Sequence, residues 1–108
     1  MTELTTTTCP AETLAHLLGK KWVPQLIELL AEKPYRFGEL TKALAGSTPK
    51  VIKQQLALLE THGIVENHKQ FSHNQTQSTY QLTETGQALF IIVAQMKAWG
   101  SQHLICPT

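Results

Sequence analysis

Apolar residues recur along much of this chain at intervals of three and four, the spacing that places them on one face of an α-helix. Proline or glycine bounds most of these stretches, and both residues commonly mark where helices begin or end. The pattern predicts helices over residues 10–18, 22–33, 35–45, 49–62 and 85–103. Residues 64–71 and 76–83 have strand character, and residues 72–75 between them are turn formers. We therefore expect a mainly α-helical fold with one small β-hairpin, an α+β fold.

A chain of 108 residues is long enough for one small hydrophobic core. The threonine-rich start, residues 1–8, has almost nothing to bury and is predicted to be a disordered arm. No repeat or linker divides the remainder. We expect residues 9–105 to form a single domain.

The last predicted helix has more apolar surface than one small domain can cover. Its apolar residues are Leu89, Phe90, Ile92, Val93, Met96 and Trp99. The excess predicts a homodimer in which this C-terminal helix lies at the interface.

The helix over residues 49–62 has two chemically different faces. Its apolar residues Ile52, Leu56 and Leu59 fall within about 60° of one another at 100° per residue, so they form the core-facing side. The opposite side carries Lys50, Lys53, Gln54, Ala57 and Thr61. That side must then be exposed to solvent.

A short helix, a turn, a second helix and a β-hairpin follow one another in the order of a winged helix-turn-helix. Lysines on the second helix can neutralise phosphates or reach guanine, glutamines can pair with adenine, and its N-terminal hydroxyls can hold a phosphate. The hairpin would touch the DNA backbone or the minor groove. The candidate DNA-contacting residues are Arg36, Ser47, Thr48, Lys50, Val51, Lys53, Gln54, Gln55, His68, Lys69, His73 and Asn74. Gln55 ranks below Gln54 because it lies nearer the core edge of the helix.

Positive charge is concentrated in the segment that would contact DNA, although the chain as a whole is nearly neutral. The whole chain carries a formal charge of +1, which is small for a nucleic-acid-binding protein. Six cationic residues and three glutamates fall between residues 33 and 75, which gives that segment a charge of +3. Two alternatives remain open: the lysines belong to an ordinary solvated face, or the domain is a winged-helix protein-interaction module that does not bind DNA.

Other chemistry finds little support in the sequence. The chain has no Asp, no catalytic motif and five scattered histidines, so we expect neither an enzyme, nor a metal site, nor a cofactor. It has no long apolar stretch and no signal peptide, which predicts a cytoplasmic protein without a membrane partner. Cys9 precedes a predicted helix start, where the helix dipole favours a thiolate. Redox sensing by Cys9 and an inert capping or interface role both remain open, and Cys106 is a weaker candidate for a partner thiol.

Several motifs in chain order resemble the HxlR-type bacterial transcriptional regulators. They are Cys9-Pro10, residues 19–22, "RFGEL" at 36–40, "STPKVIKQQLALLETHGIV" at 47–65, "YQLTETG" at 80–86, and Trp99-Gly100. The resemblance covers residues 9–100. It implies a homodimeric winged helix, dimerised through its terminal helices, that binds double-stranded DNA at an inverted repeat. We expect repression by promoter occlusion, with activation as the alternative.

The resemblance also implies roles for particular positions. The recognition helix falls on residues 49–60, the wing on residues 67–79, and the sensor thiol, which some members of the family use against oxidants or electrophiles, on Cys9. This hairpin departs from the family pattern because Lys69 is its only permanent cation and no arginine is present to enter a groove. We therefore expect the wing to contribute weakly to binding.

Overall fold

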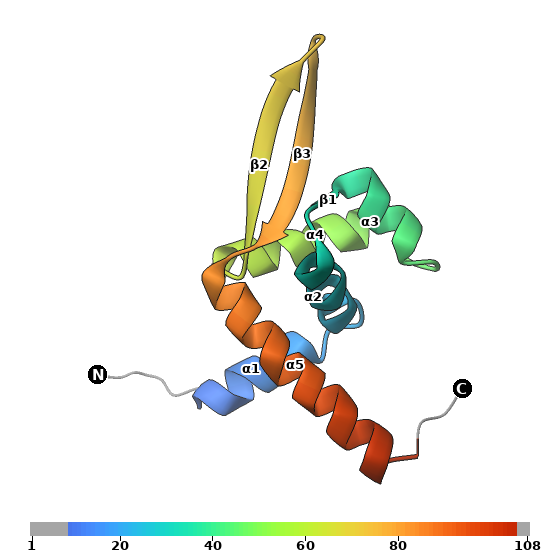
Figure 1. The fold of residues 1–108 in the computed structure, drawn as a ribbon, viewed down its shortest axis with the longest axis vertical. Helices are drawn as coiled ribbons and strands as arrows, with labels where there is room; N and C mark the ends of the chain where they lie inside the picture. Colours follow the sequence, from blue (N-terminus) through green and yellow to red (C-terminus); the bar gives the residue numbers. More distant parts are fainter. Residues whose placement is uncertain (1–8, 106–108) are drawn as a thin grey trace.

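The computed structural model describes residues 9–105, so the predicted arm at residues 1–8 and Cys106 lie outside the described residues. Its elements, shown in Figure 1, are α1 (Pro10–Leu18), α2 (Val23–Glu32), β1 (Tyr35–Arg36), α3 (Phe37–Ala43), α4 (Pro49–Thr61), β2 (Val65–Ser72), β3 (Gln75–Leu82) and α5 (Glu84–His103). This order confirms the prediction of a mainly α-helical winged helix-turn-helix with a β-hairpin.

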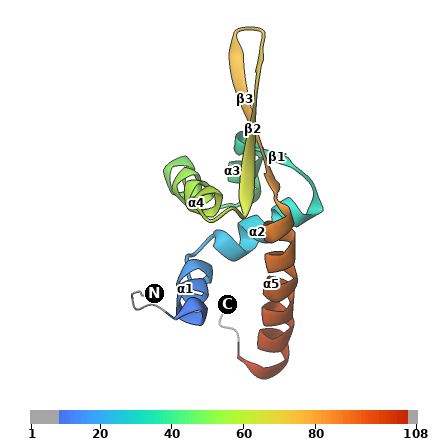
Figure 2. The ribbon, with the colours of Figure 1, turned by 90° about the vertical axis from the view of Figure 1, so that its left-hand side faces the viewer.

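The hydrophobic core is built around α2 and the inward face of α4. Leu26 and Ile27 of α2 are fully buried, as are Ile52, Leu56 and Leu59 of α4. Figure 2 shows α2 lying between α4 on one side and α5 on the other. Burial of these branched side chains fixes the rotation of α4 about its own axis, because any other rotation would expose them to water.

The third helix is shorter than the sequence pattern predicted. Residues 35–45 were expected to be helical, but Tyr35 and Arg36 form strand β1 and the helix begins at Phe37. Tyr35 pairs with Tyr80 of β3, and the Glu39 carboxylate accepts a hydrogen bond of 2.8 Å from the Arg36 N–H. Pairing with a strand distant in sequence decided this boundary, which helical spacing alone cannot reveal.

The hairpin extends far from the helices and joins β1 in a three-stranded antiparallel sheet of order β1-β3-β2 (Figure 1). The predicted strands were each displaced by one residue, since the turn contains only His73 and Asn74 between the paired ends Ser72 and Gln75. Both turn residues have positive φ, 52° and 62°. That is the backbone of the tight turn that matches the twist of two antiparallel strands.

The sequence "YQLTETG" makes a junction between the hairpin and α5. The Thr83 hydroxyl oxygen accepts a hydrogen bond from the Gly86 N–H at 3.0 Å and so caps α5, while the Thr83 N–H donates to the Ile64 carbonyl at 3.0 Å. Gly86 is buried, and a Cβ at this position would overlap the Ile64 carbonyl oxygen. The motif therefore holds the start of α5 tightly against the start of the hairpin.

Candidate nucleic-acid interface

The polar side of α4 is open to solvent in the monomer. Lys50, Lys53 and Gln54 are exposed, whereas the three apolar side chains on the opposite side of the helix are fully buried. Thr48 is the N-cap and Pro49 occupies the first turn, where its missing N–H leaves no hydrogen bond unmade. The helix thus presents two lysines and a glutamine on a surface that a duplex can reach.

Two hydroxyl groups at the N-terminus of α4 already form hydrogen bonds within the domain. The Thr48 hydroxyl oxygen accepts a hydrogen bond from the Val51 N–H at 3.3 Å, which leaves its own O–H able to donate. The Ser47 hydroxyl donates to the Leu44 carbonyl at 2.6 Å. Because a phosphate oxygen needs donors, Thr48 is better suited than Ser47 to hold one.

Two other candidates on α4 lie partly inside the domain. The Gln55 side-chain oxygen Oε1 accepts a hydrogen bond from the backbone N–H of Trp22 at 3.2 Å, which links α4 to the start of α2. Val51 is half-buried against the core. Both side chains support the position of α4, and neither lies on the exposed face that carries Lys53.

The sheet distributes the remaining candidates over two faces and one turn. Arg36 and His68 both lie opposite Thr79, so the three share a row on the same face of the sheet. Lys69 follows His68 directly and therefore points to the other face. His73 and Asn74 form the turn at the tip. The candidates on the sheet therefore fall into three places: the row of Arg36 and His68, the opposite face with Lys69, and the turn at the tip.

His68 takes part in a cross-strand hydrogen-bonded group. Its Nε2 lies 2.6 Å from Glu66 Oε1, and the Gln81 amide donates to the same oxygen at 2.7 Å. The hydrogen bond from His68, followed by that from Gln81, lowers the pKa of the Glu66 carboxyl below its usual value. The Glu66 carboxylate is thereby hydrogen-bonded within the hairpin, on the face opposite Lys69.

The exposed apolar surface of α5 lies away from its own core. Ile91, Ile92, Met96 and Trp99 are 42% to 59% exposed, whereas Leu89 and Val93, which lie beside this arc on the helix, are buried. At 100° per residue the exposed four span an arc of about 140°. We call these four residues the α5 apolar face.

Cys9 is the N-cap residue of α1 and is exposed. Its side chain makes no capping hydrogen bond, although its carbonyl oxygen accepts one from the Thr13 N–H at 2.9 Å. The thiol is therefore accessible to a reagent in solution. Cys106, the other thiol, lies outside the described residues.

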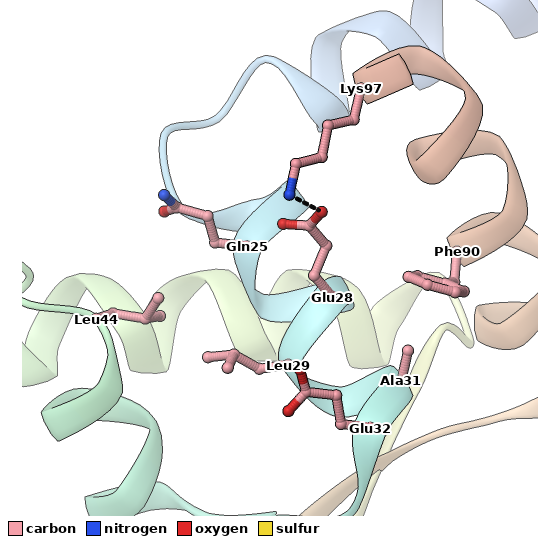
Figure 3. Close-up of a pocket in the computed structure, with 8 residues that line it drawn as sticks. All are labelled: Gln25, Glu28, Leu29, Ala31, Glu32, Leu44, Phe90 and Lys97. Atoms are coloured by element: carbon pink, nitrogen blue, oxygen red, sulfur yellow. Dashed lines mark hydrogen bonds and ion pairs between the residues drawn. The ribbon is translucent and has the colours of Figure 1, made fainter. Parts of the chain in front are cut away.

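A groove of about 440 Å³ runs between α2 and α5 (Figure 3). Lys97 of α5 donates to the Glu28 carboxylate of α2 at 3.1 Å across it, and Leu29 and Phe90 line its apolar part.

Within residues 9–105, no three His, Cys, Asp or Glu side chains are arranged to hold a metal ion. None of the helices in the same range has the length and hydropathy needed to cross a bilayer.

Comparison with known proteins gives consistent matches over nearly the whole chain. The family model described as "HxlR-like helix-turn-helix" matches residues 17–106. The HTH-type transcriptional regulator YodB of Bacillus subtilis (strain 168) is 35% identical over 97 residues, which is 89% of this chain and 86% of YodB. The structure of its reduced form has a TM-score of 0.77 at 34% identity and covers 90% of this chain and 95% of that one. The redox regulator HypR in its reduced form has a TM-score of 0.79 at 32% identity, covering 87% and 92%.

Proposed function

The chain belongs to the HxlR-like helix-turn-helix family of transcriptional regulators, as its motifs predicted. On that premise we propose that it is a homodimeric repressor whose α4 enters the major groove of an inverted-repeat operator. The two copies of α4 would lie in successive major grooves about one helical turn apart on the same side of the duplex. The protein would repress by occupying a promoter.

The exposure of Lys50, Lys53 and Gln54 beside a fully buried apolar side of α4 carries this proposal. The Thr48 O–H at the start of the helix adds a neutral donor for a phosphate. Gln55 and Val51 are left out of the proposed contact surface because they pack toward the domain. Lys69 and the tip residues His73 and Asn74 would contact the backbone or the minor groove.

We further propose that Cys9 makes the regulator responsive to oxidants or electrophiles. Cys9 is exposed at the N-terminus of a helix, a position that favours a thiolate. Relatives give independent support, because structures are known of YodB after diamide treatment and with a quinone bound, and of HypR in reduced and oxidised forms. Addition of the Cys9 thiolate to a quinone ring would need no second thiol.

Removal of the two exposed lysines of α4 tests the DNA-binding proposal. The double variant Lys50→Ala/Lys53→Ala should bind duplex DNA about 10-fold to 100-fold more weakly and reduce the slope of log affinity against log salt by about two per subunit. Fluorescence anisotropy with a labelled duplex between 50 and 200 mM salt measures both quantities. Over this range the wild type should lose about 10³ in affinity if the dimer neutralises about six to ten phosphates.

The matched control removes two other exposed lysines, Lys20 and Lys21, which lie between α1 and α2. The double variant Lys20→Ala/Lys21→Ala should keep most of the wild-type affinity and slope. Equal losses in the two double variants would mean that α4 has no special place in binding. A wild-type protein that fails to bind any duplex at low salt would instead support the protein-interaction alternative.

A further inference from the structure

Phe71 is a large apolar side chain exposed far from the other exposed apolar residues. Its exposed fraction is 73%, and it lies on β2 two residues before the turn. Every other large apolar side chain exposed within residues 9–105 belongs to α5 or to Leu104 and Ile105 directly after it. Full burial of a phenylalanine would be worth about 1.5 to 3 kcal/mol, which the isolated monomer does not gain. The α5 apolar face cannot account for this residue.

Strand register places Phe71 on the face of the hairpin that begins in the core. Phe71 lies opposite Thr76, and Lys69 lies opposite Ser78, two rows closer to the helices. Because side chains alternate along a strand, Phe71 and Lys69 share a face with Val65, which is buried in the core. The hairpin extends beyond the helices in Figure 1, so this face emerges from the core and becomes solvent-exposed. An aromatic ring and a lysine thus project from the same side of the wing.

The surroundings of Phe71 favour a nucleic acid over a protein as its partner. The neighbouring side chains Gln70, Ser72 and Thr76 are polar and exposed. A protein interface needs a contiguous apolar centre, which this hairpin lacks. A minor groove, by contrast, accepts one apolar side chain against its sugars or between two adjacent base pairs. The lysine on the same face can neutralise a phosphate at the groove edge.

We propose that Phe71 makes an apolar contact in the minor groove of duplex DNA beside the major groove occupied by α4, with Lys69 on an adjacent phosphate. This inference rests on the proposed function, since it requires that the domain binds DNA through α4 and the wing. It also changes the expectation that the wing contributes weakly. The hairpin lacks an arginine for the groove, but an apolar contact needs no charge.

Truncation of the ring separates an apolar contact from an ionic one. Phe71→Ala should weaken binding to a labelled duplex about 5-fold to 30-fold at every salt concentration and leave the slope of log affinity against log salt unchanged. Lys69→Ala should reduce that slope by about one per subunit. Gln70→Ala is the matched control, because Gln70 is exposed on the opposite face of the same strand, and it should bind within about twofold of the wild type. Thermal unfolding and sedimentation should be the same for all three variants and the wild type, because each side chain is exposed.

Two results would overturn the inference while leaving the proposed function intact. One is wild-type affinity in the Phe71→Ala variant. The other is a fall in its salt slope as large as that of Lys69→Ala, which would mean that the substitution had disturbed phosphate contacts. Failure of the wild type to bind duplex at low salt would overturn the proposed function itself, and with it the role of Phe71.

Discussion

Gln54 and Gln55 are adjacent on α4 and face different environments. Gln54 is exposed on the side with the lysines, whereas the Gln55 side chain accepts a hydrogen bond from the Trp22 N–H and helps to fix α4 against α2. Thr48 and Ser47 differ in a similar way. The Thr48 O–H is still able to donate, whereas the Ser47 O–H already donates to the Leu44 carbonyl. The potential of a polar residue to contact DNA therefore depends on which of its donors and acceptors the fold has left unpaired.

Cys9 is the residue at which the proposed response to electrophiles can be tested directly. Cys9→Ser should bind duplex DNA like the wild type but keep that binding after quinone treatment, whereas the treated wild type should lose roughly tenfold or more of its affinity. The expected protection follows because a serine hydroxyl is not ionised at neutral pH and does not add to the ring. Anisotropy titrations before and after treatment, with the added mass measured by mass spectrometry, check this prediction.

Cys106→Ser provides the matched control for the thiol chemistry. It should respond to the quinone like the wild type, because addition to a quinone requires one thiol only. An undiminished response in Cys9→Ser would show that the sensor is another residue.

At the level of elements, the junctions between helices and strands hold the proposed interface in place. Thr83 caps α5 and also bonds to the Ile64 carbonyl, so the end of the hairpin and the start of α5 are fixed to the residues that follow α4. Gly63, which ends α4, has φ of 71°, a conformation that glycine adopts without a steric penalty. The orientation of the wing relative to α4 depends on these contacts.

Gly86 and Gly38 are both helical glycines, and the structure predicts opposite effects for the same substitution. Gly86→Ala should lower the free energy of unfolding by about 2 to 3 kcal/mol, because the new methyl group would overlap the Ile64 carbonyl oxygen, which is backbone and cannot rotate away. Gly38→Ala should raise it by about 0.5 kcal/mol, since nothing lies within 4 Å of the new Cβ and alanine favours a helix. Urea denaturation of both variants tests the pair, and a stable Gly86→Ala variant would contradict the tight junction.

At the scale of the whole molecule, the two proposed interfaces occupy different parts of the fold. The tip of the hairpin lies at one end of the longest axis and the C-terminal part of α5 at the other (Figure 1). The α5 apolar face is about half exposed in the monomer, and a second copy of the chain would cover it in the proposed dimer. Two copies joined in this way would leave both hairpin tips accessible to one duplex.

Glutamate substitutions on α5 test the dimer. Met96→Glu/Trp99→Glu should be monomeric at micromolar concentration and bind DNA roughly 100-fold or more weakly, because the interface would bury unpaired carboxylates and each subunit would bind alone. Sedimentation velocity and anisotropy measure the two effects. Ala94→Glu is the control, because Ala94 is exposed on α5 outside the apolar face, and it should remain a dimer with wild-type affinity. A double variant that stays dimeric would place the interface elsewhere.

The order of the five helices and the hairpin, the inward side of α4 and the family could all be derived from the sequence. Hydrophobic periodicity and the positions of proline and glycine are local properties of a chain, and local spacing decides which side of a helix must be buried. The motifs used for the family resemblance include residues that fix the junction of the hairpin with α5: Thr83 caps the helix, and Gly86 lies tightly against Ile64.

Contacts between residues distant in sequence could be decided only by the tertiary structure. Tyr35 and Arg36 became a strand because β3 lies beside them, and Gln55 has a partner inside the domain because the Trp22 backbone N–H donates to it. Phe71 is similar: an apolar residue in a strand usually predicts a core position, but the hairpin carries it past the last helix that could cover it. Spacing along a chain gives the direction of a side chain relative to its own element, whereas its environment depends on which other elements pack there.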